Sequence, residues 1–204
     1  MRRLTSLLLA LLALGYVASC STVPAQSVAL RPDVKAPAGN VGKGKPVALR
    51  VVDARSGQVL GYRATDGSKG APITVQGDLS QAVGEPVSKA LSDLGFAPAA
   101  YKDGAPLTVT VTIRELTYQA EAKTVSRNVI TKCTLAVRAT NGPGTWEGSF
   151  PVRQERELML APDEDANARL INDVLTESLS MMMSDPELVQ FLGKDTAQGK
   201  TIKQ

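Results

Sequence analysis

Between residues 107 and 113 apolar and polar side chains alternate without a break, and this pattern constrains the fold more than any other feature of the sequence. Successive side chains of a β-strand point to opposite faces, so the segment is predicted to be a strand with one buried face and one solvated face. The alternation changes phase after Arg114, because Leu116 and Tyr118 are the next apolar pair. A β-bulge near Arg114 and Glu115 would produce this change.

Two further alternating runs follow, over residues 128–140 and 144–158, and the turn sequence NGPG joins them. Together with the first run they predict an antiparallel meander of three strands. An earlier strand is predicted over residues 46–55, which are rich in branched apolar side chains. Residues 58–63 and 71–75 are short extended pieces in a region rich in turn residues.

Two segments have the three- and four-residue apolar spacing of amphipathic helices. The first covers residues 79–94, with Asp78 as N-cap, Gln81 completing a capping box and Gly95 ending the helix in the left-handed conformation. Pro86, near Gly84, predicts a kink or an offset first turn. The second covers residues 170–182. The helical pattern restarts after it with Asp185 as cap and Pro186 in the first position.

The order of these segments is β-α-β-β-β-α, which predicts an α+β domain. We expect an antiparallel or mixed sheet of about four to five strands, with two helices packed on one face. The domain is expected to cover residues 46–193. Residues 20–45 are rich in Pro, Gly, Ala and Lys and are predicted to be a flexible tether, in which the short SVAL segment could add an edge strand. Residues 194–204 are predicted to be a polar, disordered tail.

The N-terminus has the three parts of a secretory signal peptide over residues 1–19. Arg2 and Arg3 precede an apolar stretch that has no charged residue and ends in small residues. A membrane-spanning helix needs about 20 apolar residues, and this run is no longer than that and has no basic cluster after it. Export is therefore the better interpretation.

The segment VASC at residues 17–20 resembles the lipobox of bacterial lipoproteins. The resemblance implies cleavage between Ser19 and Cys20, a diacylglycerol thioether on the Cys20 sulfur and an acyl chain on the new N-terminus. Several acyl chains hold a protein stably on a membrane, whereas one holds it only marginally. Ser21, in place of aspartate, favours the outer membrane, with the domain facing the periplasm. No other cofactor is expected.

Composition argues against several classes of function. Without Arg2 and Arg3 the 23 basic residues become 21, against 20 acidic ones, so no nucleic-acid partner is expected. The chain has no histidine, the commonest general base and metal ligand, and we expect neither a catalytic site nor a metal site. Cys133 is the only thiol left once Cys20 is lipidated, and we interpret it as a small buried side chain.

Several segments in this order resemble the YajG family of outer-membrane lipoproteins. They are the lipobox, the strand ending VVDARSG, the helix ending ALSDLGF, the paired alternating strands and the C-terminal SDPELVQFL. The resemblance covers most of the mature chain and implies an envelope lipoprotein with no established reaction.

Three hypotheses for function follow. The favoured one is a non-enzymatic accessory module that binds an envelope protein, with Asp53 and Arg55 as candidate contact residues. The second is peptidoglycan binding, since the GYRATDGSKG and DLSQAV segments are distantly similar to the wall-binding pattern of OmpA-like domains. Thr65, Asp66 and Ser80 fit that pattern, as does Leu79, but residues 81–84 lack its arginine.

The least favoured hypothesis is a periplasmic hydrolase. Its acid and base would come from a carboxylate pair, either Glu115 with Glu121 or Asp163 with Asp165. The first pair lies in solvent-facing strand sequence and the second precedes a helix, so solvation and helix capping account for them better.

Overall fold

The computed structural model describes residues 24–37, 39–63 and 70–195, and within these residues it contains eight strands and three helices. The predicted signal peptide, Ser19 and Cys20 lie outside the described residues, as does the predicted tail from residue 196. The strands are β1 (Gln26–Val28), β2 (Pro46–Asp53), β3 (Val59–Tyr62), β4 (Pro72–Val75), β5 (Ala97–Ala100), β6 (Leu107–Ala122), β7 (Arg127–Asn141) and β8 (Gly144–Leu158). The helices are α2 (Leu79–Asp93), α3 (Glu164–Ser184) and α4 (Pro186–Gly193).

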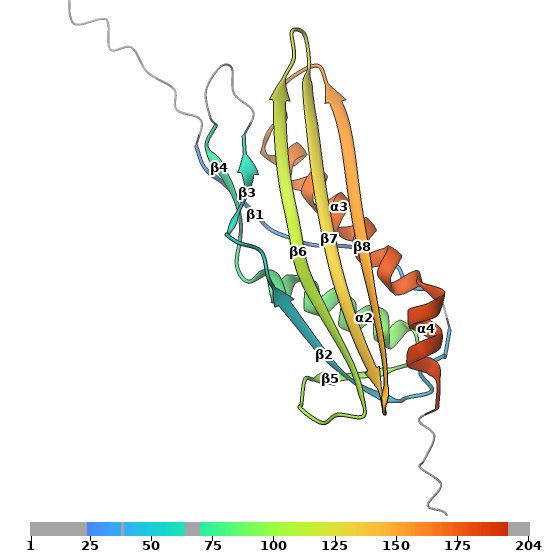
Figure 1. The fold of residues 1–204 in the computed structure, drawn as a ribbon. Coiled ribbons are helices and arrows are strands. Elements are labelled where there is room, and N and C mark those ends of the chain that lie inside the picture. The colour runs from blue at the N-terminus through green and yellow to red at the C-terminus, as the bar shows by residue number, and fades with distance from the viewer. Residues whose placement is uncertain (1–23, 38, 64–69, 196–204) are drawn as a thin grey trace, which may run out of the picture.

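All eight strands form one mixed sheet, in which the long strands β6, β7 and β8 are the antiparallel meander that the alternating runs predict (Figure 1). The other edge of β6 pairs in parallel with β2 and, farther along, with β3. β5 extends the sheet beyond β2, while β4 and β1 extend it beyond β3. A two-residue turn joins β7 to β8, and Gly142 there adopts a left-handed φ of 56°.

The α+β class and the mixed sheet agree with the prediction, but the strand and helix counts and the order β-α-β-β-β-α do not, since the described residues run β-β-β-β-α-β-β-β-β-α-α. The sheet has eight strands rather than four or five, since β1, β3, β4 and β5 are only three or four residues long. Such short strands carry too few residues for a clear alternation, and neighbours distant in sequence stabilise them. The helical restart after Asp185 is a separate helix, α4, so the described residues contain three helices rather than two.

The predicted bulge is confirmed, because the register between β6 and β7 shifts between Ile113 and Glu115. Before the bulge β6 pairs with β2, up to Asp53 opposite Ile113, and after it β6 pairs with β3 at Gly61 opposite Tyr118. A Cβ atom on Gly61 would collide with the backbone of Tyr118, so only glycine fits this crossing. The sheet therefore splits between β2 and β3 beside the bulge.

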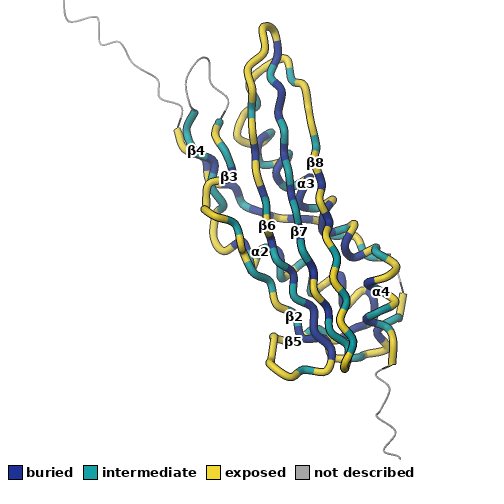
Figure 2. Tube along the Cα trace, viewed as in Figure 1, coloured by how far each residue is buried: buried dark blue, intermediate teal, exposed yellow. Residues whose placement is uncertain are grey.

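The helices cover one face of the sheet, with α2 against β2 and β5 and α3 against β7 and β8 (Figure 1). Buried side chains run along the central strands, and the turn between β6 and β7 is mostly exposed (Figure 2). Leu175, Leu179 and Met182 of α3 are fully buried at this interface. Met183 is buried too, which the predicted apolar stripe did not include. None of the helices in the described ranges is long and apolar enough to span a bilayer.

The helix caps follow the predicted signals, with two differences. α3 begins at Glu164, six residues before the predicted start at residue 170, because the Asp163 cap and the first turn lie within the acidic segment that we expected to precede the helix. Asp78 caps α2 by accepting from the backbone N–H of Ser80 at 2.7 Å, and Gly95 has a left-handed φ of 84°. The predicted capping box also needs the Gln81 side chain to bond the backbone N–H of Asp78. The Gln81 side-chain amide instead donates to Glu85, so that part of the prediction is wrong. α2 is assigned as one helix from Leu79 to Asp93 with Pro86 inside it.

Part of the predicted flexible tether is packed onto the domain. Gln26–Val28 forms the edge strand β1 against β4, as the SVAL segment suggested. Residues 29–36 then run along α3 and are called the N-terminal strap below. Lys45 donates to the carbonyl oxygens of Gly193 and Lys194 and pairs with Asp195, which fixes the end of the predicted tether against α4.

Three backbone amides of the N-terminal strap donate to three polar side chains of α3. The N–H groups of Arg31, Asp33 and Lys35 bond the side chains of Asn172, Thr176 and Ser180 at 2.6, 3.2 and 3.2 Å, in that order. Four residues of helix rise about 6.0 Å and two residues of extended chain about 6.6 Å, so the two spacings match. These hydrogen bonds to α3 hold the strap in place. They are contacts between residues far apart in the sequence, so the local pattern that predicted a tether does not reveal them.

Candidate functional site

Asp53 and Arg55, the predicted contact residues, lie where β2 ends and the sheet splits. The Arg55 guanidinium forms a two-pronged ion pair with the Asp53 carboxylate, from Nε to Oδ1 and from Nη2 to Oδ2, both at 2.9 Å. The Arg55 backbone N–H also donates to Asp53 Oδ1. These bonds to Arg55 hold the pKa of Asp53 below its ordinary value, so the carboxylate is charged at neutral pH.

The Arg55 side chain is unusually buried for an arginine. Only 7% of it is exposed, compared with 30% of the Asp53 side chain. Its third nitrogen, Nη1, is buried and has no hydrogen-bond partner among the described residues. Leaving a buried donor unpaired costs about 1–3 kcal/mol, and more for a charged group. An acceptor supplied from outside would remove that cost.

A depression of about 580 Å³ opens beside this ion pair. Its walls are the C-terminal half of β2, the following loop, the end of β4 and the start of α2. Gly77, with a left-handed φ of 79°, turns the chain from β4 into the helix. The lining residues are Arg50, Val51, Val52, Asp53, Arg55, Gln58, Val75, Gly77, Asp78, Leu79 and Ser80.

The charges in the depression balance, since two arginines and two aspartates line it. Arg55 Nη1 can donate to a carboxylate or carbonyl oxygen. The Asp53 and Asp78 carboxylates can accept from an amine or amide. Asp78 is already committed in part, because it caps α2. The arrangement therefore suits a polar group that carries both an acceptor and a donor.

The described residues contain no group of three or more carboxylate or thiol side chains that could hold a metal ion. Three of the four hydrolase candidates have other hydrogen-bond partners, and Asp165 lies in the first turn of α3. Glu115 accepts from Thr117 and Thr134, Glu121 accepts from Gln119, and Asp163 caps α3. Nothing in these contacts pairs an acid with a base.

Of the wall-binding residues, Leu79 and Ser80 line the depression, while Thr65 and Asp66 lie outside the described residues. Leu79 is only 4% exposed, so its side chain belongs to the core. Arg55, in the loop after β2, lines the same depression. The sequence pattern did not group Arg55 with Ser80, because only the fold brings these residues to one depression.

Cys133 lies in β7 and is fully buried, in agreement with its interpretation as a core side chain. Burial raises the pKa of its thiol to about 11, so the thiol stays protonated at neutral pH.

A second, more apolar groove of about 770 Å³ runs between α2 and strands β2 and β5, and the sequence interpretation missed it. Its floor includes Leu49 and Val51, and Gly84 faces Val51. The available signal was the row of small residues on one face of α2, which is Ser80, Gly84, Ser88 and Ser92. Because Gly84 has no side chain, the groove stays open at this point.

Comparison with known proteins identifies one sequence family. The model of a family described as "uncharacterized lipoprotein" matches residues 32–193. A comparison with curated proteins gave no match.

Solved structures with a similar fold share little sequence with this chain. Protein XCC0632 from Xanthomonas campestris is 13% identical, with a TM-score of 0.52, and the match covers 78% of this chain and 92% of that one. Lipoprotein GNA1162 from Neisseria meningitidis is 12% identical, with a TM-score of 0.32, and the match covers 68% and 96% of the two chains. At this identity the first likeness concerns the fold alone.

Proposed function

Because this chain belongs to the YajG family of uncharacterized lipoproteins, we propose that it is a non-enzymatic binding module of the bacterial cell envelope. In this proposal acyl chains on Cys20 anchor it to the outer membrane, and the domain faces the periplasm. Its partner is an envelope protein that binds at the depression beside Asp53 and Arg55.

The observation that carries the binding role is the buried, unpaired Nη1 of Arg55, a residue that lines an open depression. A core arginine that served only stability would gain from satisfying all its donors. Here two nitrogens hold Asp53 and the third has no partner among the described residues. A backbone carbonyl or a carboxylate of a partner would complete the set.

The anchor is tested by radiolabelled palmitate in growing cells. The wild-type protein should take up the label and co-sediment with membranes, and the Cys20→Ala variant should do neither. The Cys133→Ala variant is the control, because it removes the other cysteine and should label like the wild type. Labelling of Cys20→Ala at the wild-type level would exclude Cys20 as the attachment site.

The partner is sought with a photo-crosslinking amino acid placed at Gln58, which lines the depression. A discrete adduct should form there and not at Thr145, an exposed position of β8. Arg55→Lys should abolish the adduct, because lysine can still pair with Asp53 but has no second nitrogen to donate. An adduct that persists in Arg55→Lys, or that forms equally at Thr145, would argue against this site.

Peptidoglycan is the second candidate ligand, and the position of Arg55 favours it. Arg55 and Ser80 line the same depression. The depression therefore contains a cation, although residues 81–84 lack the arginine of the wall-binding pattern. A single free nitrogen is weaker than the two-pronged grip on a carboxylate that this mode of binding uses. In a sacculus pull-down the wild type should sediment, Arg55→Lys should not, and Arg50→Lys should behave as the wild type. If the wild type stays in the supernatant, peptidoglycan is excluded.

A further inference from the structure

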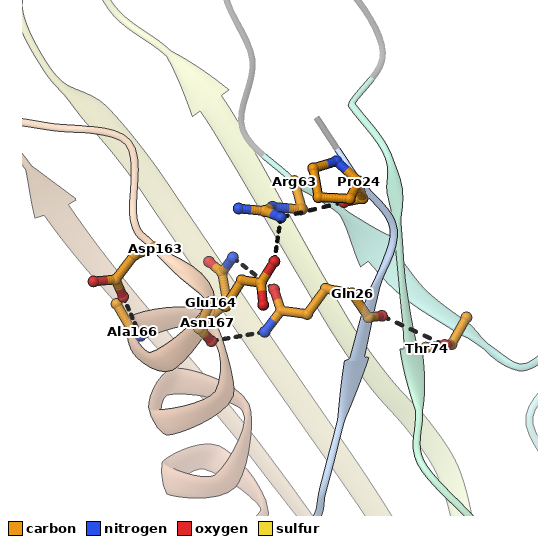
Figure 3. Close-up of polar contacts among 8 residues, drawn as sticks. All are labelled: Pro24, Gln26, Arg63, Thr74, Asp163, Glu164, Ala166 and Asn167. Atoms are coloured by element: carbon orange, nitrogen blue, oxygen red, sulfur yellow. Dashed lines mark hydrogen bonds and ion pairs between the residues drawn. The ribbon is translucent and has the colours of Figure 1, made fainter. Parts of the chain in front are cut away.

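The start of the described chain is fixed firmly to the rest of the domain. Arg63 Nη1 donates to the Pro24 carbonyl at 3.2 Å and to the Glu164 carboxylate at 2.6 Å (Figure 3). The side-chain amide of Gln26 donates to the Glu164 carbonyl at 2.7 Å. Pro24 therefore lies beside the first residue of α3.

A buried polar chain strengthens this attachment. The Asn167 amide donates to Gln26 Oε1 at 3.0 Å, and the Tyr118 hydroxyl donates to Asn167 Oδ1 at 2.6 Å. All three side chains are buried, with exposures of 5% or less. Buried hydrogen bonds of this kind fix the relative positions of the elements that they join, which here are β1, α3 and β6.

The anchor proposed at Cys20 is only four residues before Pro24. A fully extended chain spans at most about 3.6 Å per residue, so these residues reach no farther than about 14 Å. With the lipid on Cys20, the Pro24 end of the domain must stay close to the membrane surface.

The same end carries the most exposed large apolar side chains of the described residues. Val125 in the β6–β7 turn is 74% exposed, and Met159 and Leu160 in the β8–α3 connection are 75% and 81% exposed. We call these three residues the apolar tip. They line one depression, and Leu160 lies four residues before Glu164.

The other exposed large apolar side chains among the described residues do not form such a group. Val59, Tyr62, Tyr101 and Met181 are 38–47% exposed, compared with 74% or more in the tip. The apolar tip is also flanked by Lys123 and Arg127, which line the same depression, and Lys123 lies 3.6 Å from the carboxylate of Glu157. Long cationic side chains beside apolar ones suit a membrane interface, where they reach the phosphates while the apolar groups enter the acyl region.

We propose that the apolar tip inserts into the interface of the membrane that holds the lipid anchor. This inference rests on the proposed anchor at Cys20. The short reach from Cys20 places a lipid surface beside the tip, and a lipid surface is the partner that three exposed apolar residues with flanking cations fit. With a covalent anchor and a second contact, the molecule stands in one orientation. α4 and the Asp195 end of the described chain then point away from the bilayer (Figure 1).

The test uses the full lipidated protein in vesicles of phosphatidylethanolamine and phosphatidylglycerol. Trp146 is the only tryptophan, so Trp146→Phe provides a silent background. Leu160→Trp in that background should lose much of its fluorescence when brominated lipids are included, because an inserted indole lies within reach of the brominated acyl chains. Met181→Trp is the matched control, because Met181 is an exposed apolar residue in the C-terminal part of α3, and it should keep its fluorescence.

Vesicle flotation separates the two proposals. If the wild type floats and Leu160→Trp is quenched no more than Met181→Trp, the apolar tip does not enter the membrane and this inference is wrong. If the wild type fails to float, the anchor is wrong, and the inference that depends on it fails too. Both tryptophans replace exposed side chains, so neither variant disturbs the core.

Discussion

At the scale of single residues, Asp53 and Arg55 show how a buried charge depends on its neighbour. The Arg55 side chain is almost fully buried, and Asp53 supplies two of its hydrogen bonds. Removing the carboxylate would leave the guanidinium buried with fewer acceptors, which costs more than the bond itself. Asp53 is therefore needed for the fold as well as for the proposed site.

The first prediction concerns Asp53→Asn and pH. The folded-state pKa of Asp53 lies below its ordinary value of 3.8, so its contribution is fully present above about pH 4 and is lost as the pH falls below it. At pH 7 we expect Asp53→Asn to lower the free energy of unfolding by about 1–3 kcal/mol. The difference from wild type should shrink at pH 2.5, as measured by urea unfolding.

Asp103→Asn is the control for this prediction, because Asp103 is an exposed carboxylate in the loop before β6. It should change the unfolding free energy little at either pH. A wild-type advantage over Asp53→Asn that is as large at pH 2.5 as at pH 7 would contradict the assignment.

The second prediction concerns the Cys133 thiol. Its pKa rises from 9.0 to about 11 through burial, so the thiolate that reacts with disulfide reagents is about 100-fold scarcer in the folded protein. At pH 8 the folded protein should react with Ellman's reagent at least about 100-fold more slowly than the protein in guanidinium chloride. Equal rates would show that β7 is accessible in the folded state.

Sequence reasoning found the two residues of the candidate site but not the reason for their importance. Asp53 and Arg55 stand out as a charged pair at the end of an apolar strand. The unpaired nitrogen depends on what surrounds Arg55, including α2, whose first residue is 24 positions later. Cys20 rests on sequence alone and stays a prediction.

At the scale of elements, the N-terminal strap binds α3 because two residues of extended chain cover nearly the same length as four residues of helix. The strap presents every second amide to every fourth side chain of α3. The Asn172 amide also donates to the Ala29 carbonyl at 3.2 Å. Leu30 is buried, and Val34 and Ala36 pack against the core, so apolar burial supports the hydrogen bonds.

The third prediction tests this fit with Thr176→Val, which keeps the shape of the side chain and removes the acceptor for the Asp33 amide. Losing one hydrogen bond of about 1 kcal/mol should speed hydrogen exchange at Asp33 by about fivefold. Thr145→Val is the control, because Thr145 is exposed on β8 and lies far from the strap in sequence. Unchanged exchange at Asp33 in Thr176→Val would mean that the side-chain bond does not hold the strap.

At the scale of the whole molecule, the short reach between Cys20 and β1 changes what the anchor implies. A tether over residues 20–45 would let the domain diffuse away from the membrane. With β1 and the strap packed on the domain, at most about 14 Å of chain remains between Cys20 and Pro24. The domain is then held against the surface with one end toward it.

The fourth prediction follows from this geometry. Inserting ten Gly and Ser residues between Val23 and Pro24 should leave palmitate labelling and vesicle flotation unchanged. It should reduce the quenching of Leu160→Trp by brominated lipids, because a longer flexible chain lowers the effective concentration of the tip at the bilayer. A ten-residue insertion between Asp195 and Thr196, after the contacts of Lys45 with Lys194 and Asp195, is the control. Undiminished quenching with the longer tether would mean that the tip binds lipid without help from the anchor.

The sequence by itself determined the α+β class, the three-stranded meander with its bulge, the caps of α2, α3 and α4, and membership of a lipoprotein family. Each of these depends on the period of apolar residues, on caps or turns a few residues long, or on their order along the chain. Only the tertiary structure decided the short strands, the packed strap, the depression at the split in the sheet and the apolar tip at the Pro24 end. These depend on contacts between residues that are often more than a hundred positions apart, such as Lys35 with Ser180, and no local pattern encodes them.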